Sequence, residues 1–192
     1  MTGLPFGFTV RVPDSWYRFE VARAGELAGL VDARIEAVPA LRPHRDALVR
    51  ALRAVAGLAA RHGALLGAAM TGRRLCVEGP VMATLMVLHT SGRLDLDGDV
   101  IEAIAATGPA GRTVRLVELP AGRAVRVSGT SDVVFAQTLI PIPGGHGVLD
   151  LVLTSPHASL AEPMLDLFDA ISATLAWSEP ALVPSQKSEQ GK

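Results

Sequence analysis

The stretch that decides the fold runs Gly147-Val-Leu-Asp-Leu-Val-Leu-Thr-Ser-Pro156 and continues His-Ala-Ser-Leu-Ala-Glu-Pro-Met-Leu-Asp-Leu-Phe-Asp-Ala-Ile-Ser-Ala-Thr-Leu-Ala-Trp177. Its first part has leucines at every second position, the period of a strand that buries one face. Its second part repeats apolar residues at intervals of three and four, the period of an amphipathic helix. Ser159 and Glu162 are spaced as a capping box at the start of that helix. The pattern therefore predicts a strand and a helix that bury their apolar faces against each other.

Upstream of this stretch, short turns separate apolar runs. The predicted strands are Thr113 to Leu119, Arg123 to Ser128, Val133 to Ile142 and Val148 to Ser155. Connections of two to five residues join antiparallel neighbours, so these four segments form a meander. The run 133–142 is apolar on both faces, which predicts a central strand covered by helices on each side.

The N-terminal half adds further strands and helices to this meander. Strands are expected at Phe6 to Pro13, Leu65 to Thr71 and Val81 to His89, and helices at Glu26 to Val38, Pro43 to His62 and Asp99 to Ala106. Residues 72–80 are either a further strand or a long connection. We predict an α+β fold, an antiparallel sheet of about six to seven strands with helices packed on both faces (an α/β/α sandwich). Residues 1–177 should form one domain, followed by a disordered tail over 178–192 because that tail is polar.

Composition limits the classes of partner. The net charge is −1 and aromatic residues make up 4% of the chain, so neither a strong field nor base-stacking platforms favour nucleic acid. No apolar run reaches the ~18 residues that a membrane span requires, and the N-terminus lacks the pattern of a signal peptide. The single cysteine, Cys76, fits a reducing compartment. We expect a cytoplasmic protein without a membrane span.

Lysine usage excludes several chemistries. Of the 18 basic residues only Lys187 and Lys192 are lysines, and both lie in the tail. Schiff-base catalysis, pyridoxal phosphate attachment and a Walker motif all need a lysine in a folded site. We predict no bound cofactor.

Two motifs resemble ion sites without meeting their requirements. The run from Asp95 to Asp99 alternates carboxylates as a calcium loop does, but its glycine is misplaced and Ala106 stands where a bidentate Glu is needed. The glycine loop from Pro143 to Gly147 could hold an anion, but no helix N-terminus follows it. The simpler interpretation of residues 95–99 is a turn with a helix cap, and that of residues 143–147 is a plain hairpin loop. We predict no metal site.

A reactive pocket is the alternative use of the remaining polar residues. Cys76 could pair with His89, and Tyr17 or His157 could join them between the sheet and a helix. No signature of a catalytic cysteine or of a serine elbow surrounds these positions. We therefore predict no catalytic residue and keep this pocket as the alternative.

Arginines provide a further hypothesis. A turn at Ala121-Gly122 would put Arg115 and Arg126 on one face of adjacent strands, two residues apart in register, as a cationic patch for acidic groups of a partner. The alternative is a solvated sheet face, or contacts of these arginines to Glu118 and nearby acidic residues of the same chain. Arg45, Arg50 and Arg53 would form a second basic surface on the 43–62 helix.

The two ends of the chain carry a family resemblance. Phe6-Gly-Phe-Thr-Val-Arg-Val-Pro-Asp-Ser-Trp16, Thr154-Ser-Pro-His-Ala-Ser-Leu160 and Leu167-Phe-Asp-Ala-Ile-Ser-Ala-Thr-Leu-Ala-Trp177 resemble PsbP-like superfamily domains, including small actinobacterial members. The resemblance implies an antiparallel sheet between helices and a role in binding without catalysis. The matching positions are packing residues, so it assigns no functional residue.

These observations lead to a functional expectation with one alternative. We expect a non-enzymatic protein-binding or scaffold module. It could be accessory to a larger bacterial assembly such as a secretion system, and it could form a homodimer. The alternative is an enzyme or small-ligand carrier with a pocket between sheet and helix.

Overall fold

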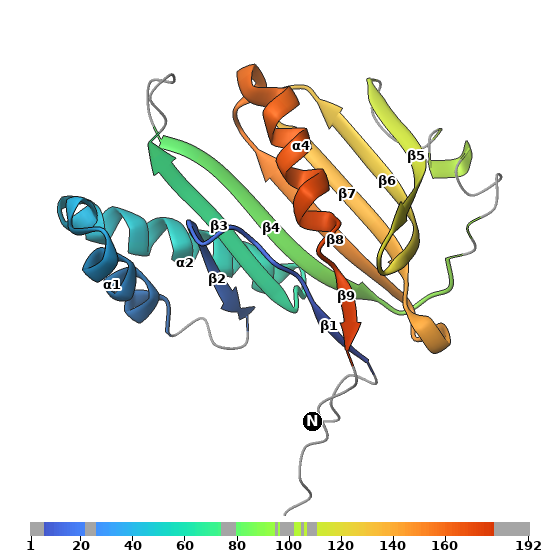
Figure 1. Cartoon of the computed structure of the whole chain (residues 1–192), viewed down its shortest axis with the longest axis horizontal. Helices are drawn as coiled ribbons and strands as arrows, with labels where there is room; N and C mark the ends of the chain where they lie inside the picture. The colour runs from blue at the N-terminus through green and yellow to red at the C-terminus, as the bar shows by residue number, and fades with distance from the viewer. Residues whose placement is uncertain are drawn as a thin grey trace, which may run out of the picture.

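The computed structural model describes residues 6–21, 26–73, 80–94, 96, 102–104, 106 and 111–178. Its centre is a seven-stranded sheet in the order β2-β3-β4-β8-β7-β6-β5, in which every neighbouring pair is antiparallel (Figure 1). The strands are β2 (Trp16–Glu20), β3 (Leu66–Arg73), β4 (Pro80–Thr90), β5 (Arg112–Leu119), β6 (Gly122–Thr130), β7 (Val134–Pro141) and β8 (Val148–Ser155). The predicted meander of β5 to β8 is confirmed.

One face of the sheet packs against helix α4 (Ala161–Ser172), which lies in front of β7 and β8 in Figure 1. Leu85, Leu151 and Leu153 are fully buried there with Phe168 of the helix. The alternating leucines of β8 thus meet the apolar stripe of α4, as the sequence predicted. Two short strands, β1 (Gly7–Thr9) and β9 (Ala176–Ser178), pair with each other and join the same core.

The opposite face carries α1 (Leu27–Ala37) and α2 (Arg45–Arg61), linked by the 3₁₀ turn Pro39–His44. Ala69 of β3 packs against these helices, whereas its neighbour Ala68 packs in the α4 core. Because successive strand residues point to opposite faces, the two helical layers lie on opposite sides of the sheet. The α+β fold with helices on both faces is confirmed.

Several details differ from the sequence prediction. Helix α4 begins after Leu160 with no side-chain cap, because Ser159 belongs to a preceding 3₁₀ turn (Ala158–Leu160). Strand β7 buries only alternate residues, since α4 covers one face and the other face is half-buried. The opening strand is limited to β1, and Trp16–Glu20 forms a sheet strand that the sequence pattern did not predict.

Some predictions concern residues outside the described ranges. Residues 74–79 lie there, so the choice between strand and connection stays open. Residues 102–104 and 106 are helical, but the rest of the predicted 99–106 helix is not described. Ser178 belongs to β9, and the remainder of the predicted tail, 179–192, is likewise outside.

Candidate functional site

Arg115 and Arg126 face each other directly across β5 and β6, because the turn consists of Pro120 and Ala121 and Leu119 pairs with Gly122. The predicted offset of two residues was therefore wrong, although the shared face was predicted correctly. That face is the one covered by α4, and the Asp169 carboxylate of α4 reaches both guanidinium groups. Its oxygens lie 2.9 Å from Arg115 Nη2 and 2.8 Å from Arg126 Nη2.

Arg126 does not belong to an exposed patch. Its residue exposure is 1%, and burial lowers the pKa of its guanidinium despite the charge of Asp169. Its Nε and Nη1 atoms are buried without a hydrogen-bond partner. The prediction that Arg126 receives an acidic group from a partner is corrected, because an acidic group of the same chain occupies that position.

Arg45 has a structural contact as well. Its Nε and Nη2 atoms donate to the two carboxylate oxygens of Asp32, at 2.5 and 2.7 Å, and this bidentate pair joins α2 to α1. The hydrogen bond from Arg45 lowers the pKa of Asp32. Arg45 therefore helps to hold the helical pair together.

Arg50 and Arg53 differ from the other predicted arginines. Both side chains are exposed on α2, and neither has an ion-pair partner among the described residues. Arg50 lies on the side of the helix opposite its buried residues Val49, Leu52, Ala56 and Ala59. Arg53 lies on the flank of the helix, four residues after Val49. Of the predicted partner-binding residues, these two are placed where a partner could reach them.

The residues of the alternative pocket do not converge. Tyr17 is buried beneath α1 and α2, where burial raises its pKa. His157 Nε2 accepts a hydrogen bond from the backbone N–H of Met82, near the start of β4. His89 lies near the end of β4, beside the ring of Phe6 and 2.8 Å from the carbonyl oxygen of His146. His89 follows Met82 by seven positions, about 23 Å along the strand, and Cys76 lies outside the described residues.

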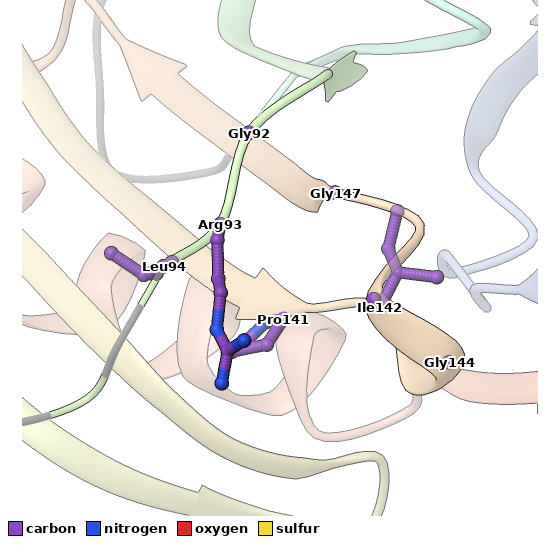
Figure 2. Close-up of a pocket in the computed structure, with 8 residues that line it drawn as sticks. Gly92, Arg93, Leu94, Pro141, Ile142, Gly144 and Gly147 are labelled. Atoms are coloured by element: carbon purple, nitrogen blue, oxygen red, sulfur yellow. The ribbon is translucent and has the colours of Figure 1, made fainter.

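A cavity of about 440 Å³ lies instead between residues 92–94, which follow β4, and the β7–β8 loop (Figure 2). Its described lining is Gly92, Arg93, Leu94, Pro141, Ile142, Gly144, Gly145 and Gly147. The Arg93 side chain extends from this segment towards Pro141. The predicted hairpin loop is confirmed, with His146 exposed and the Ile142 N–H donating to the Gly147 carbonyl at 2.8 Å.

Asp150 is a polar site that the sequence analysis missed. Its Oδ2 accepts a hydrogen bond from Gln137 Nε2 at 2.8 Å, whereas its Oδ1 is buried without a partner. In register it lies between Leu88 and Leu139, and burial raises its pKa to about 6. A carboxylate inside an otherwise apolar strand was the signal that could have identified it.

The described residues contain no group of three or more His, Cys, Asp or Glu side chains that could hold a metal ion. The acidic run 95–99 lies largely outside those residues. Within the described part of the chain, no helix has both the length and the apolar character needed to cross a membrane. No protein-family model matches the sequence, and a search of curated proteins finds no matching relative.

Proposed function

We propose that this chain is a non-enzymatic protein-binding or scaffold module of the PsbP-like type that acts in the cytoplasm. The observation that carries the proposal is the different placement of its arginines. Arg45, Arg115 and Arg126 form ion pairs within the chain, whereas Arg50 and Arg53 are exposed on α2. Arginine is enriched among the residues that dominate protein interfaces.

The interior supports the same proposal. The α4 face of the sheet is filled by large apolar side chains, and the two histidines and the tyrosine once considered for a pocket make separate structural contacts. An accessory role in a larger bacterial assembly such as a secretion system is one form of this proposal. Self-association is another, and light scattering on the purified chain would detect it.

A small-ligand carrier is the second candidate, and the 440 Å³ cavity beside Arg93 is the observation that favours it. Its volume lies within the range of about 300–1,000 Å³ typical of ligand pockets. The guanidinium of Arg93, which lines this cavity, could hold the anionic group of a small molecule.

Affinity purification of the full chain from its native host, combined with a thermal-shift screen of metabolites, tests the two candidates. We expect a stoichiometric protein partner and no stabilising metabolite. Recovery of no partner, together with a metabolite that raises Tm in wild type but not in Arg93→Gln, would replace the binding module with the carrier.

A further inference from the structure

We infer that the solvent-facing stripe of α2, formed by Arg50, Ala54, Leu58 and Arg61, is the docking surface, and that its partner is an acidic segment of another protein. This inference rests on the proposed function and adds the surface and the partner chemistry. The four residues are spaced by four, four and three positions, so they follow one side of the helix. They extend over about 17 Å, or three turns.

The stripe lies directly opposite the core of the protein. Successive residues of an α-helix turn by about 100°, which places these four on the side away from Val49, Leu52, Ala56 and Ala59. All four are exposed in the structure. The stripe therefore needs no rearrangement of the fold before a partner can contact it.

Charge on the stripe is of one sign. From residue 47 to residue 61 helix α2 contains Arg50, Arg53 and Arg61 and no carboxylate. The Asp46 carboxylate, one residue earlier, is 3.5 Å from Arg45 Nη1. Arginine forks fit carboxylates in bidentate geometry, so a surface with this charge fits Asp and Glu side chains.

Leu58 adds an apolar contact between these charges. It is 39% exposed and is one of three large hydrophobic side chains classed as exposed in the described part of the chain. An apolar side chain with Arg61 one turn away and Arg50 two turns away combines two residue types of protein interfaces, an apolar contact and arginine.

Other anionic partners fit this stripe less well. The apolar face of α2 is buried in the core, so Leu58 alone could enter a membrane, and amphipathic membrane-binding helices need a broad apolar face. The net charge of −1 provides no long-range attraction to nucleic acid. An acidic protein segment is therefore the occupant that the surface favours.

The test uses photo-cross-linking with the full chain in its native host. The cross-linking residue is introduced as Ala54→p-benzoylphenylalanine, with Ala170→p-benzoylphenylalanine on the exposed side of α4 as the matched position. We expect position 54 to label one protein within an Asp- and Glu-rich segment. Arg50→Glu with Arg61→Glu should reduce the labelling at least about tenfold, whereas Arg50→Lys with Arg61→Lys should retain much of it.

The outcomes separate this inference from the proposed function. Labelling of lipid, nucleic acid or a segment without carboxylates, or labelling that the charge reversal leaves unchanged, would overturn the inference. Labelling of a protein only at position 170 would overturn it while supporting a binding module. No labelling at either position would count against both. If the Glu variant does not fold, as judged by its thermal melt, Arg50→Gln with Arg61→Gln provides the same comparison.

Discussion

The Asp169 carboxylate lies 2.8 Å from the guanidinium of Arg126, and this ion pair fixes α4 to the sheet from which the arginine projects. Arg126 is 1% exposed, so its charge is compensated by Asp169 and very little by solvent. Arg115 approaches the same carboxylate from the neighbouring strand, but its side chain is 52% exposed. The Asp169 carboxylate thus forms ion pairs with one buried and one exposed guanidinium.

Replacing Asp169 with Asn should destabilise the fold strongly. The change leaves the buried charge of Arg126 uncompensated. Removing one partner of a fully buried ion pair costs about 3–5 kcal/mol, and the loss here should be smaller because the Asp169 side chain is 46% exposed. Urea unfolding followed by circular dichroism measures the free energy of unfolding directly.

The matched control is Arg115→Gln, which removes the exposed partner of the same carboxylate. Exposed ion pairs contribute about 0–1 kcal/mol, so this variant should unfold close to wild type. Equal losses in the two variants would show that the burial of Arg126 does not determine the energy of the pair.

The β5–β6 hairpin shows how far the sequence could predict this arrangement. Alternation correctly put Arg115 and Arg126 on one face, because both candidate turns have two residues and their registers differ by an even number of positions. The register depended on the choice between Pro120-Ala121 and Ala121-Gly122 as turn residues. Glycine is common in turns because it can adopt a positive φ, and Gly122 does have a φ of +122°. It is nevertheless the first residue of β6 and pairs with Leu119, so the glycine wrongly indicated a turn position.

The packing of α4 over that face of the sheet could not be predicted from local sequence patterns. Asp169 is 54 residues from Arg115 in sequence, and only the packing of α4 brings them together. The same limitation affected the candidate pocket. Tyr17 and His157 were grouped by residue type, whereas the sheet places Tyr17 on the α1–α2 face and His157 near the start of β4.

Asp150 should make the stability of the protein depend on pH. Its folded-state pKa of about 6 lies above the ordinary value of 3.8, so the folded protein binds the proton more tightly than the unfolded chain. Stability should therefore fall as pH rises from about 4 to about 6, and the loss should persist above that range. Asp150→Asn, which keeps an acceptor for Gln137, should be more stable than wild type at pH 7 by up to about 3 kcal/mol.

The difference between the two proteins should disappear below about pH 3, where Asp150 is neutral in both the folded and the unfolded state. Urea midpoints measured across this range give the comparison. Asp132→Asn, in the exposed turn between β6 and β7, serves as the control and should follow the wild-type curve. A constant offset between wild type and Asp150→Asn at every pH would rule out titration of this carboxylate as the cause.

Gly67 of β3 should not tolerate a side chain. Its register partner is Phe19, and a Cβ at residue 67 would lie 2.6 Å from Phe19 Cζ. The ring is buried under α1 and α2, so Gly67→Ala should displace it and destabilise the protein by about 1–3 kcal/mol. Gly29→Ala on α1, where a Cβ meets nothing within 4 Å, should instead stabilise by about 0.5–1 kcal/mol. Thermal melts of both variants test whether Gly67→Ala lowers Tm and Gly29→Ala raises it.

Gly147 sets the conformation of the loop beside the cavity, and this position requires glycine more strictly than position 145 does. Both have positive φ, +107° and +76°, so alanine is strained at either position. At residue 147, however, a Cβ would also collide with the carbonyl oxygen of Thr90 and lie 2.9 Å from His89 Nε2. A Cβ at residue 145 meets nothing within 4 Å.

Gly145→Ala should therefore lose only the strain energy, about 1–3 kcal/mol. Gly147→Ala should lose clearly more, because a backbone atom of β4 cannot move aside as a side chain can, and it should also break the contact between His89 and the carbonyl of His146. Urea unfolding gives the energies, and the imidazole resonances of His89 in NMR spectra report the broken contact. If the two variants unfold at the same urea concentration, the close approach of Gly147 to Thr90 does not hold this loop against β4.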